Sequence, residues 1–213
     1  LASIQAYSET LLNGALEDKD NNRKFVQTIS RQADRLHLLI QDMLSLAKFE
    51  SREEVFDLTA VDVGDVVNLC LERHDRQARQ EEVELRATGP DESIYVLADS
   101  EALQQILDNL IDNAIKYSSP GDRVEVKWKV VDQMLLAEVT DTGIGIAPEH
   151  QDRVFERFYR VDKARSREVG GTGLGLAIVK HLVNACQGEI ELKSTLEVGT
   201  TFIIRLPLAE VAA

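Results

Sequence analysis

The chain has 213 residues, 44% of them apolar, which is enough for one hydrophobic core and a second, smaller element. Its formal charge of -13 at pH 7 and its pI near 4.8 disfavour nucleic acid and anionic membranes as partners, because both would repel it. Cys70 and Cys186 lack metal-ligand spacing, which favours inert thiols in a reducing cytoplasm, and no apolar run approaches the roughly 18 residues of a membrane span.

Residues 1–52 are predicted to form a helical hairpin that dimerises. The apolar pattern starts at Leu1 without an N-cap, which indicates a fragment whose first helix, at about 1–17, is truncated. After a polar turn at 17–22, the second helix carries a heptad seam that leaves apolar surface uncovered, so two hairpins are expected to pair into a four-helix bundle. The seam consists of Val26, Ile29, Ala33, Leu36, Ile40, Met43 and Ala47.

Residues 53–213 are predicted to form a second domain, an α+β two-layer sandwich. Hairpins alternate with helices after a charged link at 51–54, which favours this architecture over a doubly wound parallel sheet. Asp132 and Gln133 are expected to form a hairpin turn. Strands are expected at 56–61, 83–86, 95–98, 123–131, 134–140, 189–194 and 200–206, and helices at 62–81, 101–118 and 172–187.

The predicted helix at 101–118 carries two amides at the border of its apolar face. Asp99 is suited to cap it, and Asn109 and Asn113, four residues apart, stack along one edge. A covered amide must be satisfied by a neighbouring loop or, with Lys116 one turn further on, by Mg²⁺ and phosphate. The helix alone leaves both interpretations open.

A carboxylate and two glycines follow the strand at 134–140. Asp141 stands at the strand end and Gly143 and Gly145 permit close approach of another molecule, which suits acceptance of a hydrogen bond from an amino group such as that of adenine. A loop carboxylate that caps a turn is the simpler interpretation. The Asp-Thr-Gly triplet is also the signature of aspartic proteases, but that chemistry needs two carboxylates, and the predicted dimer forms elsewhere.

Glycines at 170–175 precede the helix predicted at 172–187 and form a candidate phosphate cradle, because a helix N-terminus offers free N–H groups to an anion. The segment lacks the Lys-Ser/Thr ending of a P-loop, and no strand leads directly into it. Phe155 and Phe158 are most simply interpreted as anchors in the hydrophobic core. The charged run at 162–168 suits either a solvated loop or a lid over phosphates.

Taken together, these blocks resemble the N, G1, F, G2 and G3 boxes of sensor histidine kinases in order and approximate spacing. The resemblance covers nearly the whole chain, and the runs at 1–4 and 9–12 are similar to phosphate-regulon-type sensor kinases. It implies a Bergerat-type ATP-binding domain of the GHKL class, with a lid at about 147–171, behind a phosphotransfer hairpin. The five blocks are residues 109–118, 141–146, 155–162, 171–176 and 199–202.

The resemblance also implies roles for individual residues. Asn113 is the Mg²⁺ ligand, Asn109 and Lys116 lie near the phosphates, and Arg160 reaches the γ-phosphate, so that Asn113, Lys116 and Arg160 form the catalytic set.

On the base side, the resemblance implies that Asp141 binds the adenine amino group, Tyr117 borders the pocket and Thr201 closes it. The remaining nucleotide-binding residues are Gly143, Gly145 and Ile146 of the G1 block, and Gly171, Thr172, Gly173, Leu174, Gly175 and Leu176 of the G2 block.

The implied activity is a protein-histidine kinase with ATP and Mg²⁺ as cofactors. It transfers the γ-phosphate to a His on the dimerisation helix and then to an Asp of a response regulator receiver domain. A cytoplasmic location is implied, with the full-length protein anchored in the inner membrane as one possibility and no membrane contact from this fragment.

The family's acceptor motif, His-Glu-x-x-Thr-Pro, is absent, and none of the four histidines stands in that context. We therefore expect this fragment to bind ATP without phosphorylating itself at the usual site. Two explanations of the missing motif are open: the natural protein carries it and this fragment was trimmed, or the protein is a degenerate kinase. Alternatives are a non-catalytic, nucleotide-binding dimer scaffold and a gyrase-type or chaperone-type clamp, which the F box disfavours.

Overall fold

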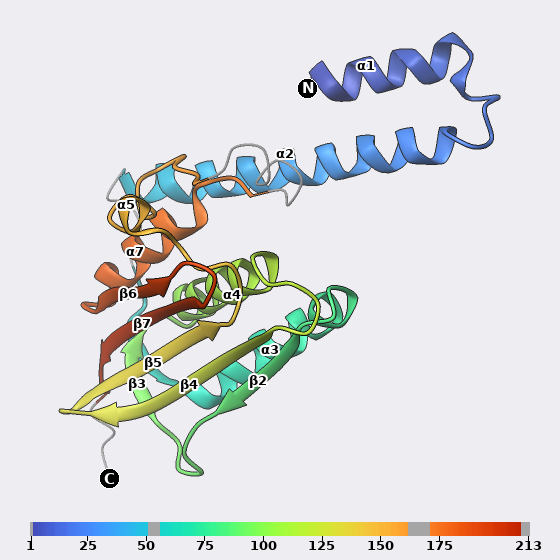
Figure 1. Cartoon of the computed structure of the whole chain (residues 1–213). Helices are drawn as coiled ribbons and strands as arrows, with labels where there is room; N and C mark the ends of the chain where they lie inside the picture. The colour runs from blue at the N-terminus through green and yellow to red at the C-terminus, as the bar shows by residue number, and fades with distance from the viewer. Residues whose placement is uncertain (1, 51–55, 162–170, 210–213) are drawn as a thin grey trace.

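The computed structural model describes residues 2–50, 56–161 and 171–209, apart from the side chains of residues 34, 35 and 45–50. A helical hairpin projects from an α/β sandwich (Figure 1). The predicted link at 51–54 lies outside the described residues. The hairpin comprises α1 (Ala2–Thr10), η1 (Leu11–Ala15) and α2 (Asn22–Glu50), and the sandwich comprises β1 (Thr59–Asp62), α3 (Val63–Gln80), β2 (Glu84–Thr88), β3 (Tyr95–Ala98), α4 (Ser100–Lys116), β4 (Arg123–Val131), β5 (Met134–Asp141), α5 (Pro148–Gln151), α7 (Gly175–Ala185), β6 (Glu189–Thr195) and β7 (Gly199–Pro207).

The hairpin leaves apolar side chains of α2 exposed in the single chain. Helices α1 and α2 pack together through the rings of Tyr7 and Phe25, whose centroids lie 5.7 Å apart. The first helix is distorted at Gly14, where φ is +116°. The exposed apolar residues lie along the predicted seam and beside it, where a partner helix would bury them. They include Val26, Ile40, Met43 and Leu44; the side chain of the predicted seam residue Ala47 is not described.

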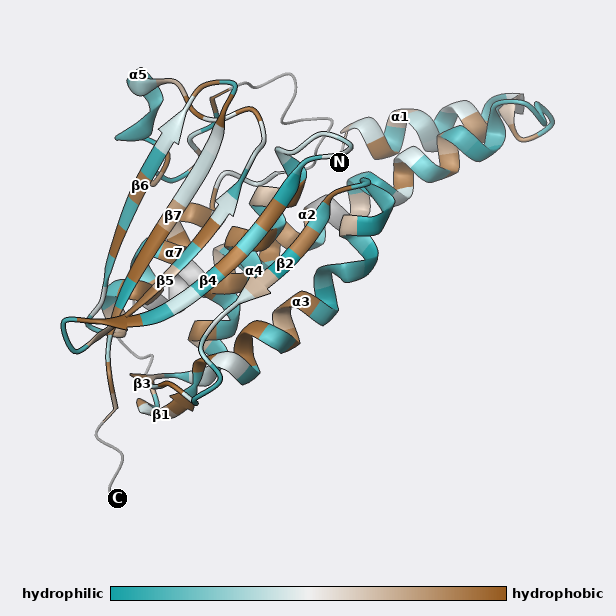
Figure 2. Cartoon of the chain, turned by 60° about the horizontal axis from the view of Figure 1, so that its bottom comes forward, coloured by the Kyte–Doolittle hydropathy of each residue, from teal (hydrophilic) through white to brown (hydrophobic). Residues whose placement is uncertain are grey.

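Five strands form a mixed sheet in the order β2-β4-β5-β7-β6, and β1 pairs with β3 in a separate two-stranded sheet. Only β2 and β4 are parallel within the five-stranded sheet. Helices α3, α4 and α7 cover one face of it (Figures 1 and 2). Asp132 and Gln133 have φ angles of 50° and 62° and join β4 to β5, as a tight hairpin requires. The predicted α+β two-layer sandwich is confirmed.

Helix α4 is the centre of the helical layer and packs between α3 and α7. Its buried face joins the apolar inner face of the sheet, where Leu110 and Ile111 are fully buried. Asp99 caps the helix as predicted, because its Oδ1 accepts a hydrogen bond from the backbone N–H of Ala102 at 3.0 Å. This packing fixes the direction in which the polar edge of α4 points.

Several predicted boundaries were wrong by a few residues. The strand expected at 56–61 is β1, Thr59–Asp62. The last helix begins at Gly175 rather than Thr172, because Gly173 has a φ of +77° and the Thr172 hydroxyl accepts a hydrogen bond from the N–H of Leu174. A glycine-rich loop therefore replaces the first turn of the predicted helix. None of the helices in the described ranges combines the length and the apolar character that a membrane crossing requires.

Candidate functional site

A pocket of about 230 Å³ opens where the end of β5, the polar edge of α4 and the glycine-rich loop before α7 meet. Helix α2 closes part of its rim. Both glycine blocks of the sequence contribute to it, although they are about 30 residues apart in the chain. The lining residues are Leu38, Asp42, Asn109, Asp112, Asn113, Lys116, Tyr117, Asp141, Ile144, Gly145, Ile146, Val154, Tyr159, Arg160, Val161, Gly171, Thr172, Gly173, Gly175, Leu176 and Thr200.

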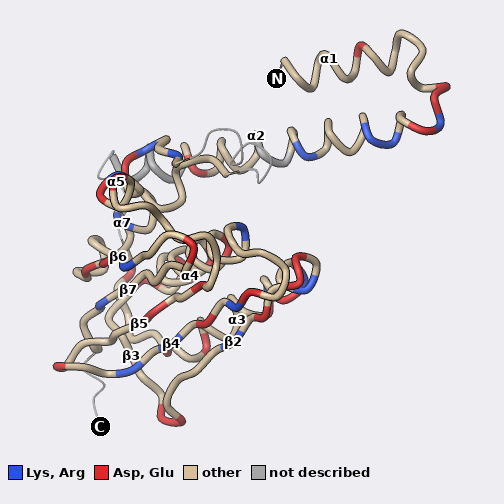
Figure 3. Tube along the Cα trace, viewed as in Figure 1, with Lys and Arg blue, Asp and Glu red and all other residues tan. Residues whose placement is uncertain are grey.

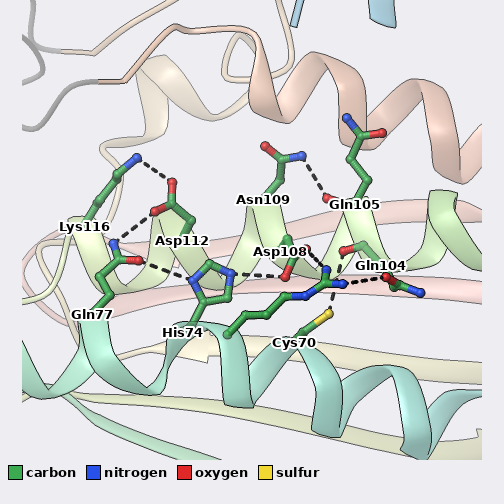
Figure 4. A network of polar contacts seen from close by, with 10 residues as sticks. Cys70, His74, Gln77, Gln104, Gln105, Asp108, Asn109, Asp112 and Lys116 are labelled. Atoms are coloured by element: carbon green, nitrogen blue, oxygen red, sulfur yellow. Dashed lines mark hydrogen bonds and ion pairs between the residues drawn. The ribbon is translucent and has the colours of Figure 1, made fainter. Parts of the chain in front are cut away.

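The polar edge of α4 faces this pocket through Asn109, Asn113 and Lys116. The Nδ2 of Asn109 donates to the carbonyl of Gln105 at 2.8 Å (Figure 4). Its Oδ1 is directed toward the glycine-rich loop, since a Cβ on Gly175 would lie only 2.7 Å from that oxygen. The helical spacing of four residues thus brings both amides to the same side of the pocket.

Asp141 is a buried carboxylate at the end of β5, only 7% exposed. Its Oδ1 accepts hydrogen bonds from the N–H groups of Gly143 at 3.0 Å and Thr200 at 3.2 Å. Burial raises the pKa of the Asp141 carboxyl to about 6, against the effect of those two N–H donors. Oδ2 takes part in none of the hydrogen bonds found in the described part of the chain, so it can accept one from a ligand.

The loop after Asp141 is held by backbone contacts that leave no room for side chains. A Cβ on Gly143 would lie 2.3 Å from the carbonyl oxygen of Tyr117, and one on Gly145 would lie 2.0 Å from that of Thr195. Gly145 also has a φ of +64°, in the region that favours glycine. The N–H of Ile146 donates to the Ser194 hydroxyl at 2.8 Å, which fixes the loop against β6.

The segment before residue 162 is anchored on the glycine-rich loop and on α5. The N–H of Phe158 donates to the carbonyl of Gly173 at 2.8 Å, and the Tyr159 hydroxyl lies 2.7 Å from Nδ1 of His150. The guanidinium of Arg153 covers the Tyr159 ring at 4.2 Å. These contacts bring Arg160 to the pocket. Residues 162–170 of the predicted lid lie outside the described residues.

Helix α2 contributes a contact that the sequence analysis did not predict. The Thr172 hydroxyl donates to Oδ2 of Asp42 at 2.7 Å and thereby links α2 to the glycine-rich loop. Burial raises the pKa of Asp42, opposed by the hydrogen bond from Thr172 and by the charge of Lys116. The hairpin therefore places a carboxyl group at the polar end of the pocket.

Most of the predicted site residues line the pocket, but Gly143, Leu174 and Thr201 do not. Gly143 packs behind the loop on the Tyr117 carbonyl, and Leu174 is fully buried in the core. The Thr201 hydroxyl lies 3.1 Å from that of Thr140. Successive strand residues face opposite sides, so Thr200 lines the pocket instead. The pocket is also lined by residues that had no predicted role of their own: Leu38, Asp42, Asp112, Ile144, Val154, Tyr159 and Val161.

The pocket combines groups that suit a nucleotide and a hard cation. Asp141 offers a carboxylate oxygen to an amino group at one end, and Asn113 and Lys116 offer an amide oxygen and a cation at the other. The described residues contain no cluster of three or more His, Cys, Asp or Glu side chains that could hold a metal ion. A cation held through amide and phosphate oxygens is consistent with the preference of Mg²⁺ for few protein ligands and a shell completed by water and phosphate.

Although the chain is acidic as a whole, positively charged side chains line this pocket. In the part of the chain that Figure 3 colours, Lys and Arg lie singly or in short runs among acidic residues. Lys116 and Arg160 both line the pocket despite the net charge of -13. An anionic ligand would therefore be attracted by local groups rather than by the whole molecule.

Two family models match the chain. Residues 98–210 match the histidine kinase-, DNA gyrase B- and HSP90-like ATPase family, and residues 1–52 match the histidine kinase A phospho-acceptor domain. The chain belongs to the sensor histidine kinases, a class of two-component signalling proteins with an ATP-binding GHKL domain. This confirms the predicted family and the hairpin-plus-sandwich architecture.

The chain is similar to sensor histidine kinase WalK of Bacillus subtilis, with 38% identity over 99% of this chain and 34% of WalK. It is 40% identical to the sensor-like histidine kinase SenX3 of Mycobacterium tuberculosis, over 97% of this chain and 50% of SenX3. The chain thus spans a third to a half of these relatives. It also resembles the structure of full-length ShkA in complex with AMPPNP, with a TM-score of 0.77 and 29% identity over 91% of this chain and 40% of ShkA.

Proposed function

We propose that this chain is the Mg²⁺-ATP-dependent kinase core of a sensor histidine kinase, which transfers the γ-phosphate to a histidine and then to an aspartate of a response regulator. The observation that carries this proposal is the arrangement within one pocket of a buried carboxylate, Asp141, and of the amide and ammonium groups of Asn113 and Lys116. The similar structure of ShkA was solved in complex with AMPPNP, which supports a nucleotide as the ligand of this chain as well.

In this proposal the residues mainly position donor and acceptor and neutralise charge. Oδ2 of Asp141 accepts the hydrogen bond of the adenine amino group, while Tyr117 and Thr200 border the base. Asn113 would hold Mg²⁺ through its amide oxygen, and the metal would neutralise developing charge on the phosphates. Lys116 and Arg160 add positive charge at the same end of the pocket.

The loop residues complete the proposed nucleotide site. Gly171, Thr172, Gly173, Gly175 and Leu176 line the phosphate side, and the anchored segment ending at Val161 is part of the proposed lid at about 147–171. The N–H groups at the start of α7 are suited to an anion. Asn109 closes the gap between α4 and this loop through its Oδ1, which faces Gly175.

Residues 1–52 are proposed to form the dimerisation hairpin and residues 53–213 the catalytic domain. The apolar residues exposed along α2, such as Ile40 and Met43, support pairing with a second copy. None of the four histidines stands in a His-Glu-x-x-Thr-Pro motif, so we place the acceptor histidine outside these 213 residues. A receiver domain is the proposed second acceptor.

Nucleotide selectivity tests the proposed base recognition. The chain is expected to bind ATP at least about tenfold more tightly than GTP, because the Asp141 carboxylate accepts from the amino group of adenine and repels the carbonyl oxygen at the same place on guanine. Titration calorimetry with both nucleotides at pH 7.5 and excess Mg²⁺ measures this ratio. Equal affinity for ATP and GTP would contradict the assigned role of Asp141.

A further inference from the structure

Lys116 does not stand alone at the pocket but is held by a carboxylate of its own helix. Its ammonium donates to Oδ2 of Asp112 at 2.5 Å, one helical turn away. Both side chains are largely covered, with exposed fractions of 23% for Lys116 and 31% for Asp112. The position of the ammonium group therefore depends on where Asp112 is fixed.

Asp112 is fixed in turn from helix α3. Its Oδ1 accepts a hydrogen bond from Nε2 of Gln77 at 3.0 Å, and Oε1 of Gln77 lies 3.3 Å from Nδ1 of His74. The other ring nitrogen of His74 lies 3.2 Å from Oδ1 of Asp108 on α4. Figure 4 shows this continuous chain of contacts from Lys116 to Asp108 along the α3–α4 interface.

In this series of contacts, every acceptor faces a donor only when His74 carries both ring protons. Asp112 accepts only, so Gln77 must give it an N–H and present its own carbonyl oxygen to His74. That oxygen requires a proton on Nδ1. Asp108 is a carboxylate that also accepts from Arg73 at 2.9 Å, so it requires a proton on Nε2. Neutral His74 would leave one of these two contacts without a hydrogen.

The charges around His74 favour the same state. On α4 it faces Asp108 and Asp112, and on its own helix Arg73 pairs with Asp108. From α2, Asp42 lines the groove of about 670 Å³ that also exposes His74, so the ring can exchange protons with solvent; its side chain is 14% exposed. Burial opposes the imidazolium, but the hydrogen bonds to Asp108 and Gln77 and the charges of Asp108 and Asp112 outweigh it and raise the pKa of His74.

We propose that Asp112 and His74 are positioning residues for Lys116, and that the protonated imidazole of His74, acting through Gln77 and Asp112, holds the ammonium where it meets the nucleotide phosphates. This inference rests on the proposed ATP site and adds a proton-dependent control of it. Loss of the His74 proton breaks one end of this series of hydrogen bonds. Gln77 can then turn, and the Asp112–Lys116 pair can move. Phosphate binding therefore weakens as pH rises through the pKa of His74.

The test compares dissociation constants of ATP and AMP between pH 6 and 8.5 for the wild type, His74→Gln and Asp112→Asn. Asp112→Asn is expected to weaken ATP binding about three- to tenfold and to leave AMP, which lacks the β- and γ-phosphates, nearly unchanged. The ratio of ATP dissociation constants, His74→Gln over wild type, is expected to be about three to ten at pH 6 and to approach one at pH 8.5. Titration of Asp141 and of the nucleotide itself is common to both proteins and cancels in that ratio.

Matched controls change the same residue types outside the chain of contacts. His37 is exposed on α2, and Asp75 pairs with Arg79 on the outer side of α3 with 52% of its side chain exposed. His37→Gln and Asp75→Asn are expected to bind ATP as the wild type does at every pH. AMP binding by each variant shows that it is folded.

The wild type alone provides a second readout. By thermodynamic reciprocity, if the His74 proton tightens ATP binding three- to tenfold, ATP must raise the pKa of His74 by about 0.5 to 1, which an NMR titration of the ring measures. This inference would be overturned, with the ATP site intact, if ATP bound normally, the ratio of its dissociation constants did not depend on pH, and ATP left the pKa of His74 unchanged. Absence of ATP binding by the wild type at every pH would instead overturn the proposed function, and this inference with it.

Discussion

Replacing Asp141 with asparagine is expected to weaken ATP binding about 10- to 100-fold, because the variant offers an amide where the adenine amino group needs a charged acceptor. Asparagine keeps the shape and can still accept from the N–H groups of Gly143 and Thr200. The lost affinity should therefore come from contacts with the adenine base and be equal for ATP, ADP and AMP. Titration calorimetry with the three nucleotides measures it.

The same substitution is expected to stabilise the protein without nucleotide. In the folded protein the pKa of Asp141 is about 6, above its ordinary value of 3.8, so folding disfavours the ionised carboxylate. The contribution of Asp141 to the free energy of unfolding is thus full below pH 4 and declines as pH rises to about 6. At pH 7, the free energy of unfolding of Asp141→Asn, measured by urea denaturation, should exceed that of the wild type by about 1 to 3 kcal/mol. A variant that lost both stability and binding would indicate a structural role instead.

The raised pKa also predicts how wild-type binding depends on pH. Below about pH 6 the Asp141 carboxyl takes up a proton, and AMP affinity should fall. Asp141→Asn has no such group, so its weaker affinity should be independent of pH in this range. A fall of the same size in the variant would assign the titration to another group.

Replacing Asn113 with alanine is expected to remove the dependence of ATP binding on Mg²⁺ and to lower phosphoryl transfer about 10²- to 10³-fold, because the metal loses its protein ligand. Asn113 lines the pocket one helical turn from Asn109, at the border of the buried face of α4. ATP titrations with Mg²⁺ and with EDTA separate the metal from the base. The variant and the wild type should bind alike in EDTA.

Asn184→Ala is the matched control for this substitution, since Asn184 is an exposed helical asparagine on α7. It should respond to Mg²⁺ as the wild type does. An Asn113→Ala protein that still bound ATP more tightly with Mg²⁺ would contradict the metal assignment.

The sequence predicted those features that a local pattern determines. The helical period placed Asn109 and Asn113 on the edge of α4, and Asp99 was recognisable as a cap because it precedes that helix directly. The strand ending at Asp141 followed from alternation, and the glycines after it from the need for close backbone approach. Each of these signals lies within about 20 residues of chain.

Features that depend on packing between distant segments were not predictable in this way. The contact between Asp42 and Thr172 joins residues 130 positions apart, and no local pattern marks it. The choice of Thr200 over Thr201 depends on the pairing register of β7, where a one-residue offset reverses the side of the sheet. The His74 chain depends on how α3 packs against α4, and a helical histidine by itself carries no such signal.

Incubation with γ-labelled ATP and Mg²⁺ tests the central claim most directly, using a version of the chain that carries a His-Glu-x-x-Thr-Pro turn ahead of Leu1. The proposed kinase should acquire acid-labile, alkali-stable phosphate, as phosphohistidine requires, and Asn113→Ala in the same background should not. Binding of ATP without formation of such phosphate would contradict a histidine kinase core and favour a nucleotide-binding scaffold.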